Sequence, residues 1–207
     1  MTQGPLIILS GPSGSGKSTV IGRLLAEGGL PLRLSVSATT RARREGEREG
    51  THYYFWTRGR FLDEIRGGAF LEWAEVHGQF YGTLRSEVEG PRARGEGVIL
   101  DIDVQGAAQV RAQYPESLSV FLRTSSPEEY ERRLRRRGTE DEAAIARRLA
   151  AAGRELERSG EYDHVVINDD LDAAVARLRA LIVPCLANRP PPPAPPPSRG
   201  GQGGVAG

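Results

Sequence analysis

The sequence predicts an α/β fold, in which helices cover a parallel sheet and a small antiparallel segment is inserted. Three observations lead to this prediction: short apolar runs recur along the chain, helical patterns lie between them, and an aromatic-rich segment interrupts the alternation. The apolar runs are continuous, which is typical of parallel strands that are buried on both faces. At 207 residues, of which 38% are hydrophobic, the chain is long enough to bury the core of one domain.

Each element follows from a local pattern. Core strands are predicted at the apolar runs 6–10, 98–103, 118–122 and 164–168. Helical spacing of apolar residues predicts helices over 17–28, 104–113, 127–137, 140–159 and 170–187. The antiparallel insertion is predicted from a short helix near 58–67 and from aromatic or alternating patches at 52–56, 70–76 and 79–83.

These elements predict one folded domain at residues 4–188. Its core comprises 4–34 and 84–188, and the insertion occupies about 35–83. The remaining residues, 189–207, are rich in proline and glycine and hold almost nothing apolar to bury. We therefore expect a disordered tail; the alternative is a proline-rich segment that docks on an aromatic groove of a partner.

Composition limits the partners and the compartment that we expect. Lys and Arg together number 28 against 27 Asp and Glu, which gives no reason to expect a nucleic acid or an acidic membrane surface as partner. The single cysteine, Cys185, cannot form an internal disulfide and is most simply part of a helix core. The sequence shows no signal-peptide pattern and no apolar run of membrane-spanning length, so we expect a cytoplasmic protein.

A glycine-rich stretch follows the first predicted strand and opens the first predicted helix. Its sequence, GPSGSGKS, matches the P-loop, whose backbone N–H groups bind nucleotide phosphates. Lys17 is the only lysine among 28 basic residues, and its compact ammonium fits a ring of amides in which a planar guanidinium would be too large. The nucleotide-binding residues predicted here are Gly11, Pro12, Ser13, Gly14, Ser15, Gly16, Lys17, Ser18 and Thr19.

A second basic segment lies at 35–50, among glycines and hydroxyl side chains. Clustered guanidinium groups on a loop can bind a phosphate with paired hydrogen bonds. Acidic residues alternate with the basic ones, so a solvated charged loop is an equally good interpretation of the composition. The arginines are Arg41, Arg43, Arg44 and Arg48, and the acidic residues are Glu45, Glu47 and Glu49.

Six motifs that follow GPSGSGKST in order closely resemble the guanylate kinase family. They are SVSATTRARREGEREGTHYYF, FLEWAEV, QFYGT, ILDIDVQGA, RRRGTEDEAAIARRL and VINDD. The resemblance covers about residues 5–186. It implies the P-loop nucleoside monophosphate kinase fold with a helical lid at about 135–150, and a monomer or homodimer. It also implies the reaction of ATP with GMP to give ADP and GDP, with Mg²⁺.

The resemblance also implies which residues bind GMP. Arg41, Arg44, Tyr53 and Tyr81 would hold the phosphate, and Ser37, Glu72 and Thr83 would read guanine. The carboxylate of Glu72 can accept from guanine N1–H and from the exocyclic amine, whereas adenine would leave it unpaired, at a cost of roughly 1–3 kcal/mol or more. Without the resemblance, the two tyrosines would be interpreted as strand aromatics and Glu72 as an exposed strand residue.

Two aspartates end the strand in VILDID, where open α/β sheets place their ligands. Asp101 resembles the acidic residue that supports Mg²⁺ in such enzymes through water, together with the hydroxyl of Ser18. Asp103 points to the same face by the strand period of two and would line the guanine side of the site. A helix N-cap is the alternative for Asp103.

The resemblance assigns the lid arginines as well. Arg137 and Arg148 match the two arginines that close over the triphosphate, and Asn168 would contact the ATP base or its neighbouring loop. Residues 132–137 could otherwise be a solvated basic helix end. The transfer would need positioning and charge stabilisation by Lys17, Arg41, Arg137 and Arg148, and no general base.

This sequence departs from the family pattern at three positions. Arg43 stands where proline is common, which could loosen the loop or compete with Arg44 for the phosphate; Phe80 replaces a frequent tyrosine, and Thr83 replaces serine. A kinase for another acceptor, such as ribose 1,5-bisphosphate, would need no guanine reader. A non-catalytic guanylate kinase-like binding module typically has a degraded P-loop, whereas this one is complete. A GMP kinase is therefore the preferred interpretation.

Overall fold

The computed structural model describes residues 3–76, 78–136 and 142–187. Its central feature is a five-stranded parallel sheet in the order β2-β7-β1-β8-β9, which confirms the predicted α/β core. The strands are β1 (Leu6–Ser10), β2 (Leu32–Leu34), β7 (Gly97–Asp101), β8 (Leu118–Arg123) and β9 (His164–Ile167). Only β2 is absent from the predicted set, because its sequence LRL forms no apolar run.

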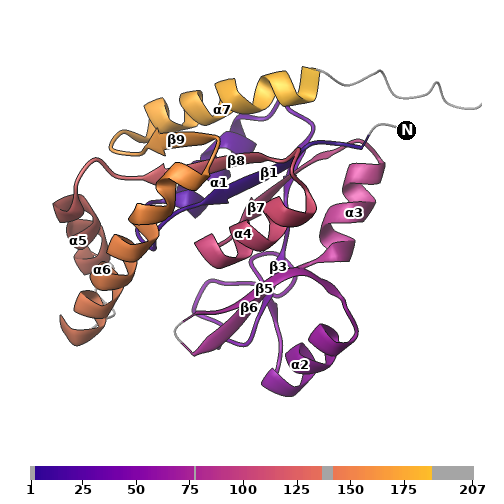
Figure 1. The fold of residues 1–207 in the computed structure, drawn as a ribbon, viewed down its shortest axis with the longest axis horizontal. Coiled ribbons are helices and arrows are strands. Elements are labelled where there is room, and N and C mark those ends of the chain that lie inside the picture. The colour runs from indigo at the N-terminus through magenta and orange to yellow at the C-terminus, as the bar shows by residue number, and fades with distance from the viewer. Residues whose placement is uncertain (1–2, 77, 137–141, 188–207) are drawn as a thin grey trace, which may run out of the picture.

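Helices cover both faces of this sheet (Figure 1). In β1, Ile7 and Leu9 pack in a buried cluster with α1 and α7, whereas Leu6 and Ile8 pack in a second cluster with α3 and α4. Successive strand side chains point to opposite faces, so both faces must be apolar.

No helix within the described ranges is long and apolar enough to cross a membrane. The four helices are α1 (Lys17–Glu27), α3 (Arg85–Ala93), α4 (Val104–Gln113) and α7 (Leu171–Ala187).

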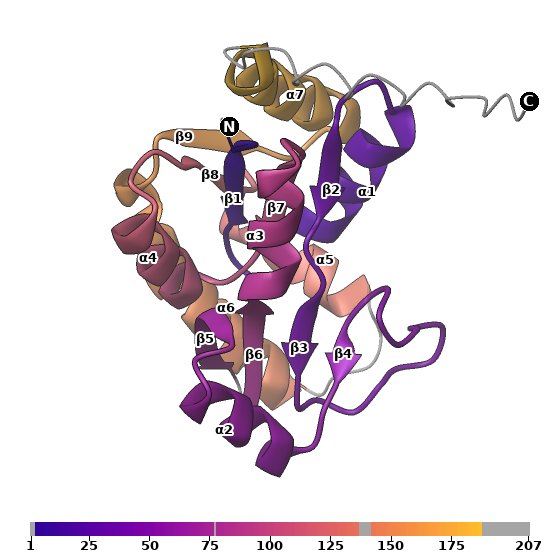
Figure 2. The same ribbon diagram turned by 90° about the vertical axis from the view of Figure 1, so that its right-hand side faces the viewer.

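A second sheet lies beside the core, in the order β4-β3-β6-β5 (Figure 2). Strand β6 pairs antiparallel with β3 and β5, as predicted for the insertion, and the two-residue β4 joins β3 in parallel. This sheet has its own apolar cluster, in which the Phe61 ring stacks 4.4 Å from Phe70 and 5.4 Å from Phe80 between centroids. The elements are β3 (Ser37–Thr39), β4 (Tyr54–Phe55), α2 (Arg58–Arg66), β5 (Phe70–Val76) and β6 (Gln79–Leu84).

Two further helices, α5 (Pro127–Arg136) and α6 (Glu142–Glu157), lie side by side at one edge of the core (Figure 1). A short 3₁₀ helix, η1 (Arg158–Glu161), leads from α6 to β9. Both helices follow the predicted helical spans closely. Arg137 and the predicted tail at 189–207 lie outside the described residues.

We expect Phe61→Ala to destabilise the protein by about 3–5 kcal/mol, because Phe61 is fully buried between two stacked rings. Leu62→Ala is the matched control: Leu62 is the next residue of α2 and its exposed fraction is 37%, so a loss below about 1 kcal/mol is expected. Urea unfolding of both variants measures the difference. Equal losses would show that the aromatic cluster is not the core of the second sheet.

Candidate active site

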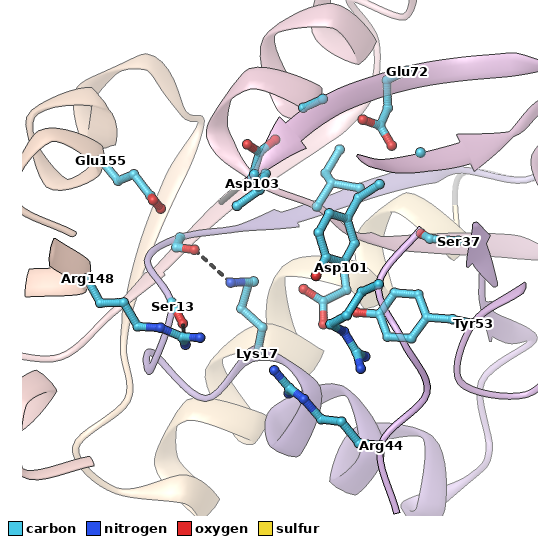
Figure 3. A pocket seen from close by; sticks show the side chains of 17 residues that line it. Ser13, Lys17, Ser37, Arg44, Tyr53, Glu72, Asp101, Asp103, Arg148 and Glu155 are labelled. Carbon is cyan, nitrogen blue, oxygen red and sulfur yellow. Dashed lines mark hydrogen bonds between the residues drawn. The ribbon is translucent and has the colours of Figure 1, made fainter. Parts of the chain in front are cut away.

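A cavity of about 240 Å³ opens at the carboxyl ends of β1 and β7, between the second sheet and α6 (Figure 3). It brings together residues that lie far apart in the sequence. On one side stand Lys17 and Ser13 of the predicted P-loop, and on the other stand Ser37, Tyr53 and Glu72 of the second sheet region (Figure 3). The predicted site residues that line it are Gly11, Ser13, Lys17, Ser37, Arg41, Arg44, Tyr53, Glu72, Tyr81, Asp101, Asp103 and Arg148.

The predicted P-loop connects β1 to the N-terminus of α1. Two of its glycines have backbone angles and surroundings that admit no side chain. Gly11 has a φ of 139°, and a Cβ there would lie 2.1 Å from the Leu122 carbonyl oxygen of β8. Gly16 has a φ of 92°. The Lys17 ammonium donates to the Gly11 carbonyl oxygen at 2.7 Å, which holds it over its own loop. The loop therefore presents bare backbone and a positive charge to the cavity.

Asn168 holds this loop from behind. Its side chain is 4% exposed, and its Nδ2 donates to the Ser15 carbonyl oxygen at 2.7 Å. Arg133 of α5 donates to the Asn168 carbonyl oxygen at 2.6 Å and pairs with Glu129 one turn earlier at 2.6 Å. Asn168 thus contacts the P-loop, while its predicted place beside the ATP base stays a prediction. The prediction missed Arg133, which the basic run 132–137 did not distinguish from its neighbours.

The Ser18 hydroxyl donates to Asp101 Oδ2 at 2.9 Å, at the end of β7. A hydroxyl and a carboxylate in contact are oxygen ligands of the kind that Mg²⁺ prefers. Within the described residues, no group of three or more His, Cys, Asp or Glu side chains could hold a metal ion. The pair therefore fits a magnesium ion that takes its other ligands from phosphate oxygens and water.

One carboxylate, that of Glu47, holds the basic segment at 35–50 in place. Glu47 accepts two hydrogen bonds from the Arg41 guanidinium, at 2.7 and 3.0 Å, and a third from the backbone N–H of Arg44 at 2.7 Å. These contacts raise the pKa of Arg41 and lower the pKa of Glu47. Arg43 and Arg44 are both exposed, and of the two only Arg44 lines the cavity. The loop is thus built around Arg41, and the prediction missed Glu47 because its sequence position suggested only a solvated charge.

Two phenols complete this side of the cavity. The Arg41 guanidinium lies 5.4 Å from the centroid of the Tyr53 ring, and Tyr53 meets Tyr81 edge-on at 6.0 Å. Burial, with the nearby charge of Asp101, raises the pKa of the Tyr53 phenol to about 12. The phenol therefore remains protonated and can donate a hydrogen bond.

Glu72 is a buried acid, with 4% of its surface exposed, so the alternative of an exposed strand residue is wrong. Thr83 lies behind it and donates its hydroxyl to Glu72 Oε1 at 2.6 Å. Burial raises the pKa of the Glu72 carboxyl to about 7; the Thr83 hydroxyl opposes this shift and the charge of Asp103 adds to it. A Cβ at Gly106 would lie 2.2 Å from Glu72 Oε2, so any side chain there would displace the acid.

Asp103 is the helix N-cap considered as an alternative for it. Its Oδ1 accepts from the backbone N–H of Gly106 at 2.8 Å, which caps the N-terminus of α4. The same side chain lines the cavity, and its charge adds to the raised pKa of Glu72. Because β7 ends at Asp101, Asp103 belongs to the turn into α4 and not to the strand.

Helix α6 supplies the remaining wall. Arg148 Nη1 donates to the Ser13 hydroxyl of the P-loop at 3.2 Å. Glu155, two turns further along the helix, also lines the cavity and was not among the predicted site residues. No local pattern in the sequence distinguishes it from the other charges of this helix.

Comparisons with known proteins identify relatives of this chain. The family model described as guanylate kinase matches residues 3–184. A guanylate kinase of Symbiobacterium thermophilum is 50% identical over 182 residues, which cover 87% of this chain and 85% of that protein. A guanylate kinase of Vibrio cholerae is 46% identical over 183 residues, covering 88% of each. The crystal structure of guanylate kinase from Anaplasma phagocytophilum has a TM-score of 0.75 and 35% identity, over 88% of this chain and 86% of that one.

The raised pKa of Glu72 makes the folding stability depend on pH. The pKa of this carboxyl is near its ordinary value of 4.5 in the unfolded chain and about 7 in the folded protein. At low pH the buried carboxyl is neutral, and as the pH rises from 4.5 through 7 the folded protein must either hold the proton or bury a charge, so the free energy of unfolding falls. We expect the free energy of unfolding to fall by about 2 kcal/mol more in the wild type than in Glu72→Gln between pH 5 and 7. Urea unfolding at both pH values measures this. Glu75→Gln, exposed on the same strand, is the control; identical pH dependence in all three proteins would contradict the assignment.

Proposed function

We propose an assignment of the active site for this chain, which belongs to the guanylate kinase family and transfers a phosphoryl group from ATP to GMP. One observation carries the assignment: a complete P-loop and a guanidinium–phenol–carboxylate set face each other across one cavity. Two nucleotides bound there would meet phosphate to phosphate. Neither a kinase for another phosphorylated acceptor nor a non-catalytic binding module is favoured, because relatives covering nearly the whole chain are guanylate kinases.

ATP would bind on the P-loop side. The bare backbone from Gly11 to Ser18 and the N-terminus of α1 would hold the phosphate oxygens, with Lys17 next to the transferred group. Arg148, already in contact with Ser13, would neutralise charge that develops during transfer. Arg137 is proposed for the same role. Asn168 would maintain the loop conformation through its bond to Ser15.

Ser18 and Asp101 would hold Mg²⁺, with Asp101 acting through water. When bound with ATP, this ion supplies charge neutralisation for the phosphate oxygens. The two side chains are already in hydrogen-bond contact at 2.9 Å, so little rearrangement is needed. Asp101 ends β7 and Ser18 lies in the first turn of α1, so both stand at the carboxyl ends of the strands, where open α/β sheets bind ligands.

The GMP phosphate would bind between Arg41, Arg44, Tyr53 and Tyr81. A guanidinium carries more N–H donors than the carboxylate of Glu47 accepts, so Arg41 keeps donors for a phosphate while Glu47 fixes its orientation. The protonated Tyr53 phenol adds a neutral donor. Two cations and two phenols suit a dianion.

Guanine would bind at Glu72, with Ser37 and Asp103 beside it. In its ionised form Glu72 can accept from N1–H and the exocyclic amine, and the Thr83 hydroxyl fixes the carboxylate for this purpose. Guanine donors would also favour the ionised acid, whose pKa is otherwise about 7. Adenine offers an acceptor at N1 and would leave the buried acid unpaired.

The chemistry requires no covalent intermediate, because the GMP phosphate oxygen is itself the nucleophile. The protein positions it against the terminal phosphate of ATP and stabilises the transferred charge. We infer that the second sheet region (about 35–83) is the GMP-binding unit and that the segment at about 135–150 is a lid. Both would close over the nucleotides and exclude water, which would otherwise hydrolyse ATP.

The working partners that we propose are therefore ATP and GMP, with no nucleic acid or membrane. The nearly balanced charge of 28 basic and 27 acidic residues supports this. We further propose that the enzyme is a monomer or homodimer and that it works in the cytoplasm, where both nucleotides are available.

A panel of acceptors tests the function. Purified protein with ATP and Mg²⁺ is given GMP, AMP, ribose 1,5-bisphosphate or no acceptor, and ADP formation is followed. We expect rapid turnover with GMP and only background ADP without acceptor, because the closed site excludes water. Turnover with the sugar phosphate alone would move the function to another kinase. GMP binding without turnover would indicate a binding module.

Lys17→Ala serves as the matched variant in this panel. It removes the ammonium next to the transferred phosphate, so GMP-dependent ADP formation should fall by at least about a thousandfold while the thermal unfolding temperature stays close to that of the wild type. Near-normal turnover in this variant would contradict the proposed role of the P-loop.

Glu72→Gln tests the guanine reader. An amide can turn a donor towards adenine N1, so the ratio of kcat/KM for GMP to that for AMP should fall about tenfold or more. The comparison uses the same enzyme preparation with each nucleotide at saturating ATP. An unchanged ratio would mean that guanine is recognised by other residues.

A further inference from the structure

Glu155 is a carboxylate in the cavity to which the proposed mechanism gives no role. It projects from α6 into the cavity, on the side opposite Ser37 and Tyr53 (Figure 3). Within the part of the chain that the structure describes, it has no hydrogen bond and no ion pair. Burial raises its pKa; the cations of Lys17, Arg154 and Arg158 oppose the shift, and the anion of Asp103 adds to it. Its carboxylate oxygens are not buried, so they can accept a hydrogen bond from a ligand in the cavity.

The other acidic groups of the cavity already have partners. Glu72 accepts from Thr83, Asp101 accepts from Ser18, and Asp103 accepts from the backbone of Gly106. The proposed assignment likewise provides for most of the GMP molecule: Glu72 takes the base donors and the arginines take the phosphate. The ribose remains, and its 2′ and 3′ hydroxyl groups are the donors of GMP that still lack an acceptor.

The position and charge of Glu155 suit an interaction with the ribose hydroxyls of GMP. Arg148 and Glu155 are seven residues apart on α6, so they occupy the same face of the helix, two turns apart. Arg148 reaches Ser13 of the P-loop, which leaves Glu155 facing the space bounded by Lys17 and Asp103. A ribose lies between its base and its phosphate, and is uncharged. A hydroxyl can therefore approach Glu155 without the repulsion that a phosphate would meet.

We propose that Glu155 accepts a hydrogen bond from the ribose hydroxyls of GMP and so selects ribonucleotide over deoxyribonucleotide acceptors. The inference rests on the proposed function, because it takes the cavity as the GMP site. It makes Glu155 a specificity residue carried by α6. Acidic side chains bind ribose hydroxyls in this way in dinucleotide-binding folds.

The test measures kcat and KM of the wild type and of Glu155→Ala for GMP, 2′-deoxy-GMP and 3′-deoxy-GMP. We expect the KM for GMP to rise about tenfold in the variant, as for the loss of one hydrogen bond to a charged group, with kcat changed less than threefold. In the wild type, the KM for at least one deoxy analogue should exceed the KM for GMP by a similar factor. Glu155→Ala should not raise the KM for that analogue further. Glu155→Gln keeps a carbonyl acceptor, so its KM for GMP should lie between those of the wild type and of Glu155→Ala.

Glu157→Ala is the matched control, because Glu157 is exposed on the same helix and does not line the cavity. An equal rise in KM for GMP and both deoxy analogues would overturn the proposal, and would show that Glu155 acts on Lys17 or on the lid. No change with any acceptor would overturn it as well. Absence of GMP turnover in the wild type is a separate outcome: it would overturn the proposed function, and this inference with it.

Discussion

The site depends on one steric constraint: a loop that binds phosphates with its backbone must keep that backbone bare. A Cβ on Gly11 would lie 2.1 Å from the Leu122 carbonyl oxygen of β8, and a Cβ on Gly16 would lie 2.4 Å from the Asn168 amide nitrogen. The loop is therefore held between the strand before it, the neighbouring strand and the turn after β9. Its rigidity comes from the parallel core, and the charges are then added at its rim by Lys17 and Arg148.

The second sheet region holds two ionisable side chains, Arg41 and Glu72, that are partly or fully removed from water. Glu47 holds Arg41 in a fixed orientation, and Thr83 holds Glu72, so both of these side chains have a partner before any ligand arrives. The cost of desolvation remains visible at Glu72, whose pKa is raised to about 7. A guanine base can relieve that cost, and this relief is a physical basis for selecting one purine over the other.

Much of this architecture could be predicted because its signals are local. Continuous apolar runs mark β1 and β8, and glycine spacing marks the P-loop. Helix α3 was not predicted, because RSEVEGPRA contains Gly and Pro and no helical stripe of apolar residues. The contacts of Glu47 and Glu155 could not be predicted either. They depend on how a loop and a lid helix are oriented in space, and neighbouring residues in the sequence carry the same charge.

The use of arginine for every basic position but one has a chemical consequence. Besides the α-amino group, Lys17 is the only amine in the chain, and it is half-buried against the Gly11 carbonyl. Reagents that acylate lysine therefore have a single side-chain target, and that target is the phosphate-binding cation. One acetyl group would remove its charge and fill the loop at the same time. A bound nucleotide would shield the amine, so the labelling of one residue would report how much of the enzyme is occupied.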